Sequence, residues 1–303
     1  MSIEQTSAVA PAPPGGTARL AAATRLGAVH LTVTRLDTSV AFYQDSIGLR
    51  LHRREDSVAS MGTGDEDVLV LHEQRAARPA GRHAGLYHFA LLFPTRAELA
   101  RAALRLADRR TPVDGLSDHG THEAIYLPDP DGNGIELAAD RPRDQWPLFG
   151  GGAGYAAGPA PLDVEDLLRA VSGEEPRRHA DSGLRIGHVH LHVGDLDAAT
   201  RFYVEGIGFE LMAQLPTARF VAAGGYHHHV GFNVWQGIGV DPAPADAVGM
   251  RHWTLELAGR TELEALRERL AGIGVAASEE AGGLLARDPS GNVVFAGVDG
   301  GAA

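Results

Sequence analysis

The 303-residue chain is 44% hydrophobic and 22% charged with a net charge of -12, which is typical of soluble globular domains and disfavours nucleic acid or an anionic membrane as partner. It has no cysteine, and all 27 basic residues are arginine, so thiolate and Schiff-base chemistry are both excluded. Fifteen histidines remain as neutral nitrogen ligands and proton carriers.

The first 24 residues differ from the rest in being rich in Ala, Pro and Gly. They lack the basic start and apolar core of a signal peptide, so we expect a disordered tail and a cytoplasmic protein. A first domain is predicted at residues 25–147. It opens with a strand at Ala28–Val33, a short helix ending near Gly48, and strands at Ser57–Met61 and Asp67–His72.

A second unit of the same kind follows within this domain. It begins with a strand at Tyr87–Phe93 and continues with an amphipathic helix at Thr95–Arg109. A hairpin then joins strands at Glu123–Leu127 and Gly134–Ala138 through a Pro-Asp-Gly turn. Each unit therefore has the order β-α-β-β-β.

Residues 148–183 are predicted to be a linker, because Gly-rich and polar stretches surround one short helix at Leu162–Val171. The second domain, residues 184–298, repeats the first. Ile186–Phe209 (IGHVHLHVGDLDAATRFYVEGIGF) matches Leu26–Leu49 (LGAVHLTVTRLDTSVAFYQDSIGL) at an offset of 160 residues. We therefore predict an α+β fold with four β-α-β-β-β modules paired into two cupped half-barrel domains, one for each copy.

The two copies differ in one residue type that carries chemistry. Glu136 follows the first DPDGN tail, whereas Phe295 follows the matching DPSGN. Strand alternation places His30, His88 and Glu136 on the faces away from the helix-packed core. Two imidazoles and one carboxylate on one face are the ligand set of non-haem Fe(II) oxygenases, so we predict that these three residues bind one divalent metal.

These segments resemble the vicinal oxygen chelate superfamily, and most closely its two-domain catechol 2,3-dioxygenase-like proteins. The resemblance rests on the repeated HLTVTRLDTSVAFYQDSIGL segment, the IYLPDPDGNGIEL ending, the RPRDQWP tail and the GGYHHHVGFNVW stretch. It implies an extradiol ring-cleaving dioxygenase that acts on a catechol-type diol with O₂ and Fe(II), with Mn(II) as a second choice.

The resemblance also implies roles for individual residues. His30, His88 and Glu136 match the metal ligands, and Tyr126, ten residues before the Glu, matches a hydrogen-bonding tyrosine near the substrate. His119 matches an acid–base histidine, although it lies about two residues closer to the tyrosine than in the better-known members. His72 matches a further histidine about fifteen residues before the second ligand. One group must take a proton from the catechol and another must return one.

The second copy lacks the carboxylate. His190 and His252 hold its matching histidine positions, and one of His227, His228 and His229 could complete an all-histidine site for Zn²⁺ or another divalent ion. A vestigial pocket with hydrogen-bonded histidines is the alternative. We expect the copies to superpose with His30 on His190 and His88 on His252.

Two other functions remain open. One is glyoxalase-like metal-dependent isomerase or lyase chemistry, which usually needs a second carboxylate that Asp67–His72 lacks at its central positions. The other is non-catalytic sequestration of a small molecule, which needs no His-His-Glu set. The expected partners are a small aromatic substrate and O₂, with no nucleic acid and no membrane, and a homo-oligomer is left open.

Overall fold

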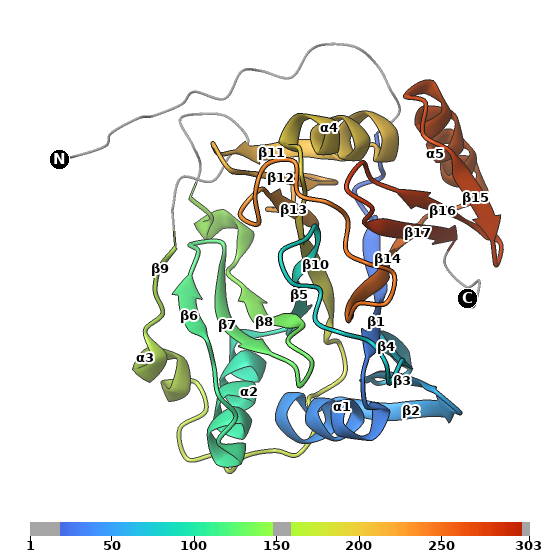
Figure 1. Cartoon of the computed structure of the whole chain (residues 1–303). Coiled ribbons are helices and arrows are strands. Elements are labelled where there is room, and N and C mark those ends of the chain that lie inside the picture. The colour runs from blue at the N-terminus through green and yellow to red at the C-terminus, as the bar shows by residue number, and fades with distance from the viewer. Residues whose placement is uncertain (1–18, 148–158, 299–303) are drawn as a thin grey trace.

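The computed structural model describes residues 19–147 and 159–298, and four β-α-β-β-β modules account for most of them (Figure 1). Helices α1 and α2 lie at one end of the molecule, and α4 and α5 at the other, with the first strands of the modules between them. The first module contains β1 (Arg25–Val33), α1 (Leu36–Phe42), a π-helical turn η1 (Tyr43–Ile47), β2 (Arg50–Glu55), β3 (Val58–Thr63) and β4 (Glu66–Glu73). The second contains β5 (Gly85–Leu92), α2 (Arg96–Arg109), β6 (Gly115–Asp118), β7 (His122–Pro128) and β8 (Gly134–Asp140).

The second copy repeats this order after a short connection. The connection holds a 3-10 turn η2 (Arg143–Gln145), β9 (Ala160–Pro161), which pairs with β6, and α3 (Val164–Arg169), the helix predicted there. The third module contains β10 (Arg185–His192), α4 (Leu196–Thr200), η3 (Arg201–Ile207), β11 (Glu210–Gln214), β12 (Ala218–Ala222) and β13 (Val230–Asn233). The fourth contains β14 (Gly249–Leu257), α5 (Arg260–Gly272), β15 (Ala277–Glu280), β16 (Gly283–Arg287) and β17 (Val293–Val298).

Strand pairing joins modules from different copies. β5 pairs antiparallel with β10, with His88 opposite His190, and β1 pairs antiparallel with β14, with His30 opposite His252. Modules two and three therefore form one cup, which contains Glu136 and is called the Glu136 cup below. Modules one and four form the other, the Phe295 cup. β1 and β10 meet at a single residue pair, Leu26 and Ile186.

This arrangement confirms the predicted fold class and corrects the domain assignment. Residues 25–147 and 184–298 do not each close a cup of their own, because each cup takes one module from each copy. The physical reason is that β1 and β10, the first strands of the two copies, have similar edges, so either could pair with a neighbouring strand. Hydrophobic alternation fixes which face of a strand is buried, but it does not say which of two similar neighbours will pair with its edge.

The repeated Asp tails are explained by the same contact in both copies. The Asp129 carboxylate accepts hydrogen bonds from the backbone N–H groups of Asp131 and Asn133, and from the buried Tyr43 hydroxyl at 3.0 Å. In the second copy Asp288 accepts from Tyr203 in the same way, also at 3.0 Å. These bonds fasten each hairpin turn to the π-helical segment of the preceding module, which holds the last strand in place.

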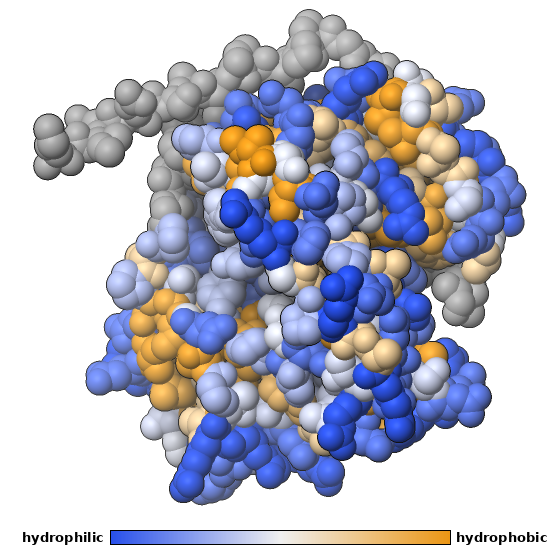
Figure 2. Space-filling model, viewed as in Figure 1, coloured by the Kyte–Doolittle hydropathy of each residue, from blue (hydrophilic) through white to orange (hydrophobic). Residues whose placement is uncertain are grey.

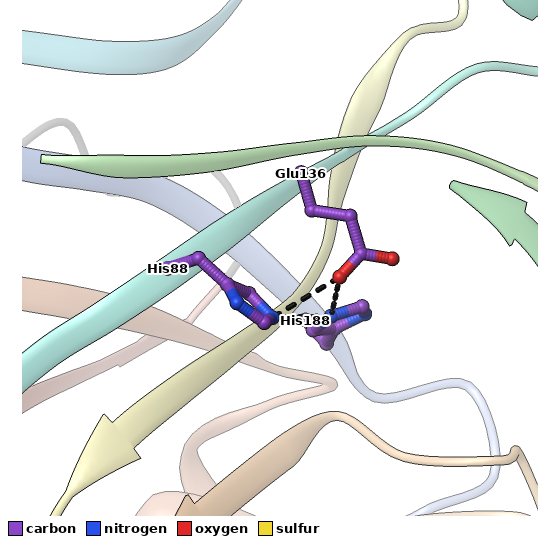
Figure 3. Close-up of side chains that lie close together, drawn as sticks. All are labelled: His88, Glu136 and His188. Atoms are coloured by element: carbon purple, nitrogen blue, oxygen red, sulfur yellow. Dashed lines mark hydrogen bonds and ion pairs between the residues drawn. The ribbon is translucent and has the colours of Figure 1, made fainter. Parts of the chain in front are cut away.

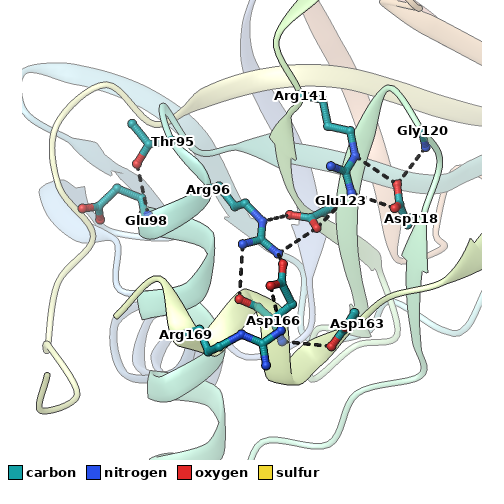
Figure 4. A network of polar contacts seen from close by, with 10 residues as sticks. All are labelled: Thr95, Arg96, Glu98, Asp118, Gly120, Glu123, Arg141, Asp163, Asp166 and Arg169. Atoms are coloured by element: carbon teal, nitrogen blue, oxygen red, sulfur yellow. Dashed lines mark hydrogen bonds and ion pairs between the residues drawn. The ribbon is translucent and has the colours of Figure 1, made fainter. Parts of the chain in front are cut away.

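A polar network holds β7, the strand that carries His122 and Tyr126 (Figure 4). The buried Glu123 carboxylate accepts hydrogen bonds from Arg96, at the start of α2, and from Arg141, just after β8. Arg96 also binds Asp166 of α3, so the connecting helix joins the same network. Glu123 points toward the helices, and its strand neighbours on either side point into the cup.

Replacing Glu123 with alanine is expected to destabilise the fold, because two arginines lose a buried carboxylate that they share. A buried partner lost from such a network typically costs about 1–3 kcal/mol. The midpoint of urea unfolding should fall at an unchanged slope. Glu165→Ala, a change on the neighbouring α3, is a suitable control, and a Glu123→Ala midpoint equal to that of the control would contradict the assignment.

The predicted tail is shorter than expected. Residues 1–18 lie outside the described residues, but Leu20 and Thr24 are buried, and the Ala21 N–H donates to Glu262 of α5 at 2.8 Å. Residues 19–24 thus pack on the second copy. No helix of the described residues is long and apolar enough to cross a membrane. The face in Figure 2 is mostly hydrophilic and shows several separate hydrophobic patches.

Candidate metal centre

Three side chains from three strands meet inside the Glu136 cup (Figure 3). His88 comes from β5, Glu136 from β8 and His188 from β10, and all three are buried. Glu136 Oε2 lies 3.1 Å from His88 Nε2 and 3.1 Å from His188 Nε2, and the two nitrogens are 3.4 Å apart. Strands β8, β5 and β10 are consecutive neighbours in the sheet, which is why these residues converge.

The donor spacing fits a single metal ion. Ligand distances of about 2.0–2.2 Å place neighbouring donors about 3.0–3.5 Å apart in octahedral or tetrahedral geometry. The three donor–donor distances lie in that range. Two imidazole nitrogens and one carboxylate oxygen are also the donor set of non-haem iron sites with open positions. This group is the one found among the described residues in which three potential ligand atoms all lie within 4.8 Å of one another.

Electrostatics keep two of the donors, Glu136 and His188, in the forms that bind metal. Burial alone would raise the pKa of Glu136, but the surrounding imidazoles of His188, His122 and His88 outweigh burial and hold that pKa well below its usual range. Burial lowers the pKa of His188 despite the neighbouring carboxylate. An ionised carboxylate and a neutral imidazole are the ligating forms of both residues.

His30 does not lie in this cluster, which corrects the predicted set of three. It is in the Phe295 cup, where its Nδ1 lies 3.1 Å from His72 Nε2 and its ring stacks on His252 with centroids 3.9 Å apart. His72 is therefore also in the Phe295 cup and away from Glu136. The cause is the exchange of modules: β1, which carries His30, pairs with β14 and β4, not with β5.

His188 is the residue that sequence reasoning missed. It lies two positions before His190 on β10, and His188, His190 and His192 share one face of that strand. A signal was present in the repeat, since the residue equivalent to His188 in the first copy is Ala28. This histidine, present only in the second copy, marks that copy as the one that supplies the third residue of the Glu136 cluster. The histidine that the two copies share on this strand is His190, which matches His30.

Two of the residues for which proton-transfer roles were predicted, Tyr126 and His119, lie together in the Glu136 cup. The Tyr126 hydroxyl lies 2.8 Å from His119 Nε2, and the Tyr126 ring lies 5.5 Å from that of His88. Burial, followed by the charge of Glu136, raises the pKa of Tyr126, so its O–H remains a donor. Burial lowers the pKa of His119 to about 4, which leaves its ring neutral and able to accept a proton.

A further set of histidines surrounds the carboxylate from its other side. His122 Nε2 lies 3.0 Å from Glu136 Oε1, and His122 stacks on His227 at 4.7 Å. His227 Nε2 lies 3.0 Å from Asp140, which fixes the third module against the end of β8. The ring of His228 lies 4.1 Å from that of His188. Sequence reasoning placed His227 and His228 in the second copy's own site and did not single out His122, yet all three lie around the Glu136 cluster.

The hypothesis of an all-histidine site in the second copy does not hold as drawn. His190 lies opposite His88 in the Glu136 cup, whereas His252 lies opposite His30 in the Phe295 cup. His229 Nδ1 accepts a hydrogen bond from the backbone of Ala223. In the Phe295 cup, Ala28 and Phe295 stand at the positions of His188 and Glu136. Only the position of His88 still holds a potential ligand there, His252.

The histidines of the Phe295 cup predict a pH dependence of stability. Burial, His252 and His72 lower the pKa of His30 to about 3. The unfolded chain takes up a proton at this ring as the pH falls below its ordinary value of 6.5, while the folded chain stays neutral until about pH 3. Folding is therefore favoured at neutral pH, and this contribution is lost progressively as the pH falls through that window.

His30→Gln should reduce the dependence of unfolding free energy on pH between pH 4.5 and 6 by about one proton. Denaturant unfolding at several pH values measures this slope. His83→Gln, on the loop before β5, serves as control. Equal slopes for wild type and His30→Gln would show that His30 is already protonated in the folded state.

Known proteins are similar to this chain over most of its length. The family model described as the Glyoxalase/Bleomycin resistance protein/Dioxygenase superfamily matches residues 25–137 and 185–294. A Bacillus subtilis (strain 168) protein named catechol-2,3-dioxygenase is 37% identical over 271 residues, which cover 88% of this chain and 94% of the relative. A Rhodococcus globerulus protein named biphenyl-2,3-diol 1,2-dioxygenase 3 is 30% identical over 124 residues, covering 38% and 63% respectively.

Solved structures share the fold across most of the chain. A Bacillus subtilis protein assigned as a dioxygenase matches with a TM-score of 0.64 at 13% identity, covering 93% of this chain and 87% of that one. Glyoxalase I from Zea mays matches with a TM-score of 0.57 at 17% identity, covering 90% and 92%. At these identities the likeness concerns the fold alone.

Proposed function

Because the chain belongs to the Glyoxalase/Bleomycin resistance protein/Dioxygenase superfamily, we propose that it is an extradiol ring-cleaving dioxygenase acting on a catechol-type diol. The single observation that carries the proposal is the convergence of His88, Glu136 and His188 with donor spacings that suit one divalent metal. The near full-length relative named catechol-2,3-dioxygenase supports the same activity. Fe(II) is the proposed metal, with Mn(II) as the second choice for the same donors.

The proposed reaction places both atoms of O₂ in the product. A carbon–carbon bond beside the diol breaks, and the ring opens to an unsaturated acid with an aldehyde or ketone at the other end. Fe(II), when bound, would chelate the diol and let electrons pass from the ring to O₂. The protein must then orient the diol, accept one of its protons and return a proton to oxygen.

The residues around the cluster divide these tasks. His119 is neutral and its Nε2 accepts the Tyr126 O–H, so the Tyr126 oxygen can accept the O–H of the diol and pass a proton on to His119. His228 lies against His188 on the other side and is held neutral, because burial and the neighbouring His188 lower its pKa. We propose His228 as the second proton carrier. It belongs to the third module and lies on the His188 side of the cluster.

Glyoxalase-like isomerase or lyase chemistry is the alternative within the same superfamily. The ligand group contains one carboxylate, Glu136, whereas that chemistry usually uses two. The intact ligand set also disfavours simple sequestration of a small molecule. The site therefore fits oxygenation better than either alternative.

Metal identity distinguishes these functions. We expect anaerobically purified protein to contain about one equivalent of iron or manganese per chain, and to turn over a catechol with O₂. Nickel or zinc together with turnover of a thiohemiacetal would favour the isomerase, and metal-free protein that binds a small molecule unchanged would favour sequestration.

A further inference from the structure

A β-bulge changes the direction of one aromatic side chain beside the metal centre. In the β5–β10 pair, His88 lies opposite His190, and the next paired residue is Leu86 opposite Leu191. Tyr87 is thus an extra residue without a partner, and its ring lies on the histidine side of the sheet, 5.2 Å from the ring of His190. Bulges of this kind often change the direction of a side chain next to an active site.

A glycine on the neighbouring strand, Gly134 of β8, lies directly against this bulge. A Cβ on Gly134 would lie 2.1 Å from the Tyr87 carbonyl oxygen, so only glycine permits this approach. The equivalent residue in the second copy is Val293. The bulge of the fourth module carries Arg251 in the position of Tyr87, so an aromatic ring at this point belongs to the Glu136 cup.

Tyr87 is one member of a continuous set of rings that we call the aromatic wall. Trp235 lies 5.3 Å from Tyr87 and 5.4 Å from His190, which in turn lies 5.0 Å from the proposed ligand His88. Phe220 continues the wall from His190 at 5.6 Å to His228 at 5.1 Å. The wall therefore reaches from the metal centre to the surface.

Hydrogen bonds from one buried amide hold the wall in place. The buried Asn233 amide donates to His190 Nε2 at 3.0 Å, and its oxygen accepts the Trp235 backbone N–H at 3.0 Å and contacts His192 Nδ1 at 2.8 Å. Tyr87 and Trp235 nevertheless remain 40% and 53% exposed. Apolar ring surface thus stays open at the outer end of the wall.

We propose that the aromatic wall binds an apolar, flat substituent of the substrate, so that the preferred substrate is an aryl-substituted catechol. This inference rests on the proposed ring-cleaving function. One ring, His190, lies between Trp235 and His88. A substituent on the catechol can extend that far, whereas the diol ring itself stays at the metal. The exposed faces of Tyr87 and Trp235 are apolar aromatic surface, which binds a flat apolar group favourably.

The test compares substituted and unsubstituted substrates. The ratio of kcat/KM for biphenyl-2,3-diol, or for 4-phenylcatechol, to that for catechol is measured in wild type, Trp235→Ala and Tyr87→Ala. A hydrophobic contact of this size discriminates about 10–100-fold, so the ratio should fall by about that factor in both variants. Ile238→Ala, an exposed apolar change three residues beyond Trp235, should leave the ratio unchanged. Tyr87→Phe should also retain it, because the ring is kept.

Three results would overturn the proposal. The first is wild-type enzyme without preference for either aryl-substituted catechol. The second is an equal loss on all substrates in Trp235→Ala and Tyr87→Ala, which would make the two rings structural. The third is a change in oligomeric state on size-exclusion chromatography at an unchanged ratio, which would make the wall a self-association surface. Failure of the underlying function gives a different result, since no catechol would then be cleaved by wild type.

Discussion

Replacing His188 with alanine is expected to abolish metal binding and ring cleavage, even though His188 lies in the copy that lacks the glutamate. Its Nε2 is 3.1 Å from the Glu136 carboxylate and 3.4 Å from His88 Nε2. Loss of an outer hydrogen-bonding partner typically costs about 10–100-fold in metal affinity, and loss of a ligand should exceed that. Metal titration and kcat measured on the same samples test this expectation.

His30→Ala provides the matched control. His30 also lies on the first strand of a module, and its ring contacts two histidines, but it is in the Phe295 cup. It should therefore leave metal content and kcat close to those of wild type. If His30→Ala lost the metal and His188→Ala kept it, the metal site would belong to the first copy alone, and the exchange of modules would be contradicted.

The second large effect is expected at the proton-transfer pair. Tyr126→Phe and His119→Ala should each lower kcat by about 10²–10⁴-fold at unchanged metal content, because in the proposed reaction the two residues, 2.8 Å apart, transfer the diol protons. The pH profile of kcat should change as well, which a purely structural role would not produce. Stopped-flow measurement of product formation separates this step from substrate binding.

His72→Ala is the control for this pair. His72 was an equally good candidate by sequence, but it lies against His30 in the Phe295 cup. It should have little effect on kcat or its pH profile. Full activity in both Tyr126→Phe and His119→Ala would mean that other groups move the protons.

Much of the fold could be predicted from the sequence, because local signals specify it. The repeat at an offset of 160 residues, the alternation within each strand and the Asp tails predicted four modules and their elements. Alternation also identified His88, Glu136 and Tyr126 on one face, as β5, β8 and β7 place them. Within a module these relations depend only on neighbouring strands.

What could not be predicted is how the modules pair. The edges of β1 and β10 are equivalent, so either could lie beside β5, and only the complete packing decides between them. That choice determines whether His30 or His188 joins His88. The direction of the Tyr87 side chain could not be predicted for another reason. Strict alternation assigns Tyr87 to the core face, but the bulge beside His88 turns its ring into the cup.

Ring cleavage at the Glu136 cluster is measured by loading the protein anaerobically with Fe(II), adding O₂ and following catechol and O₂ together. We predict about one iron per chain, one O₂ consumed for each catechol, and a yellow ring-fission product, all absent in His188→Ala and present in His30→Ala. A chain fully loaded with iron that leaves every catechol and the dissolved O₂ unchanged would contradict the proposed function.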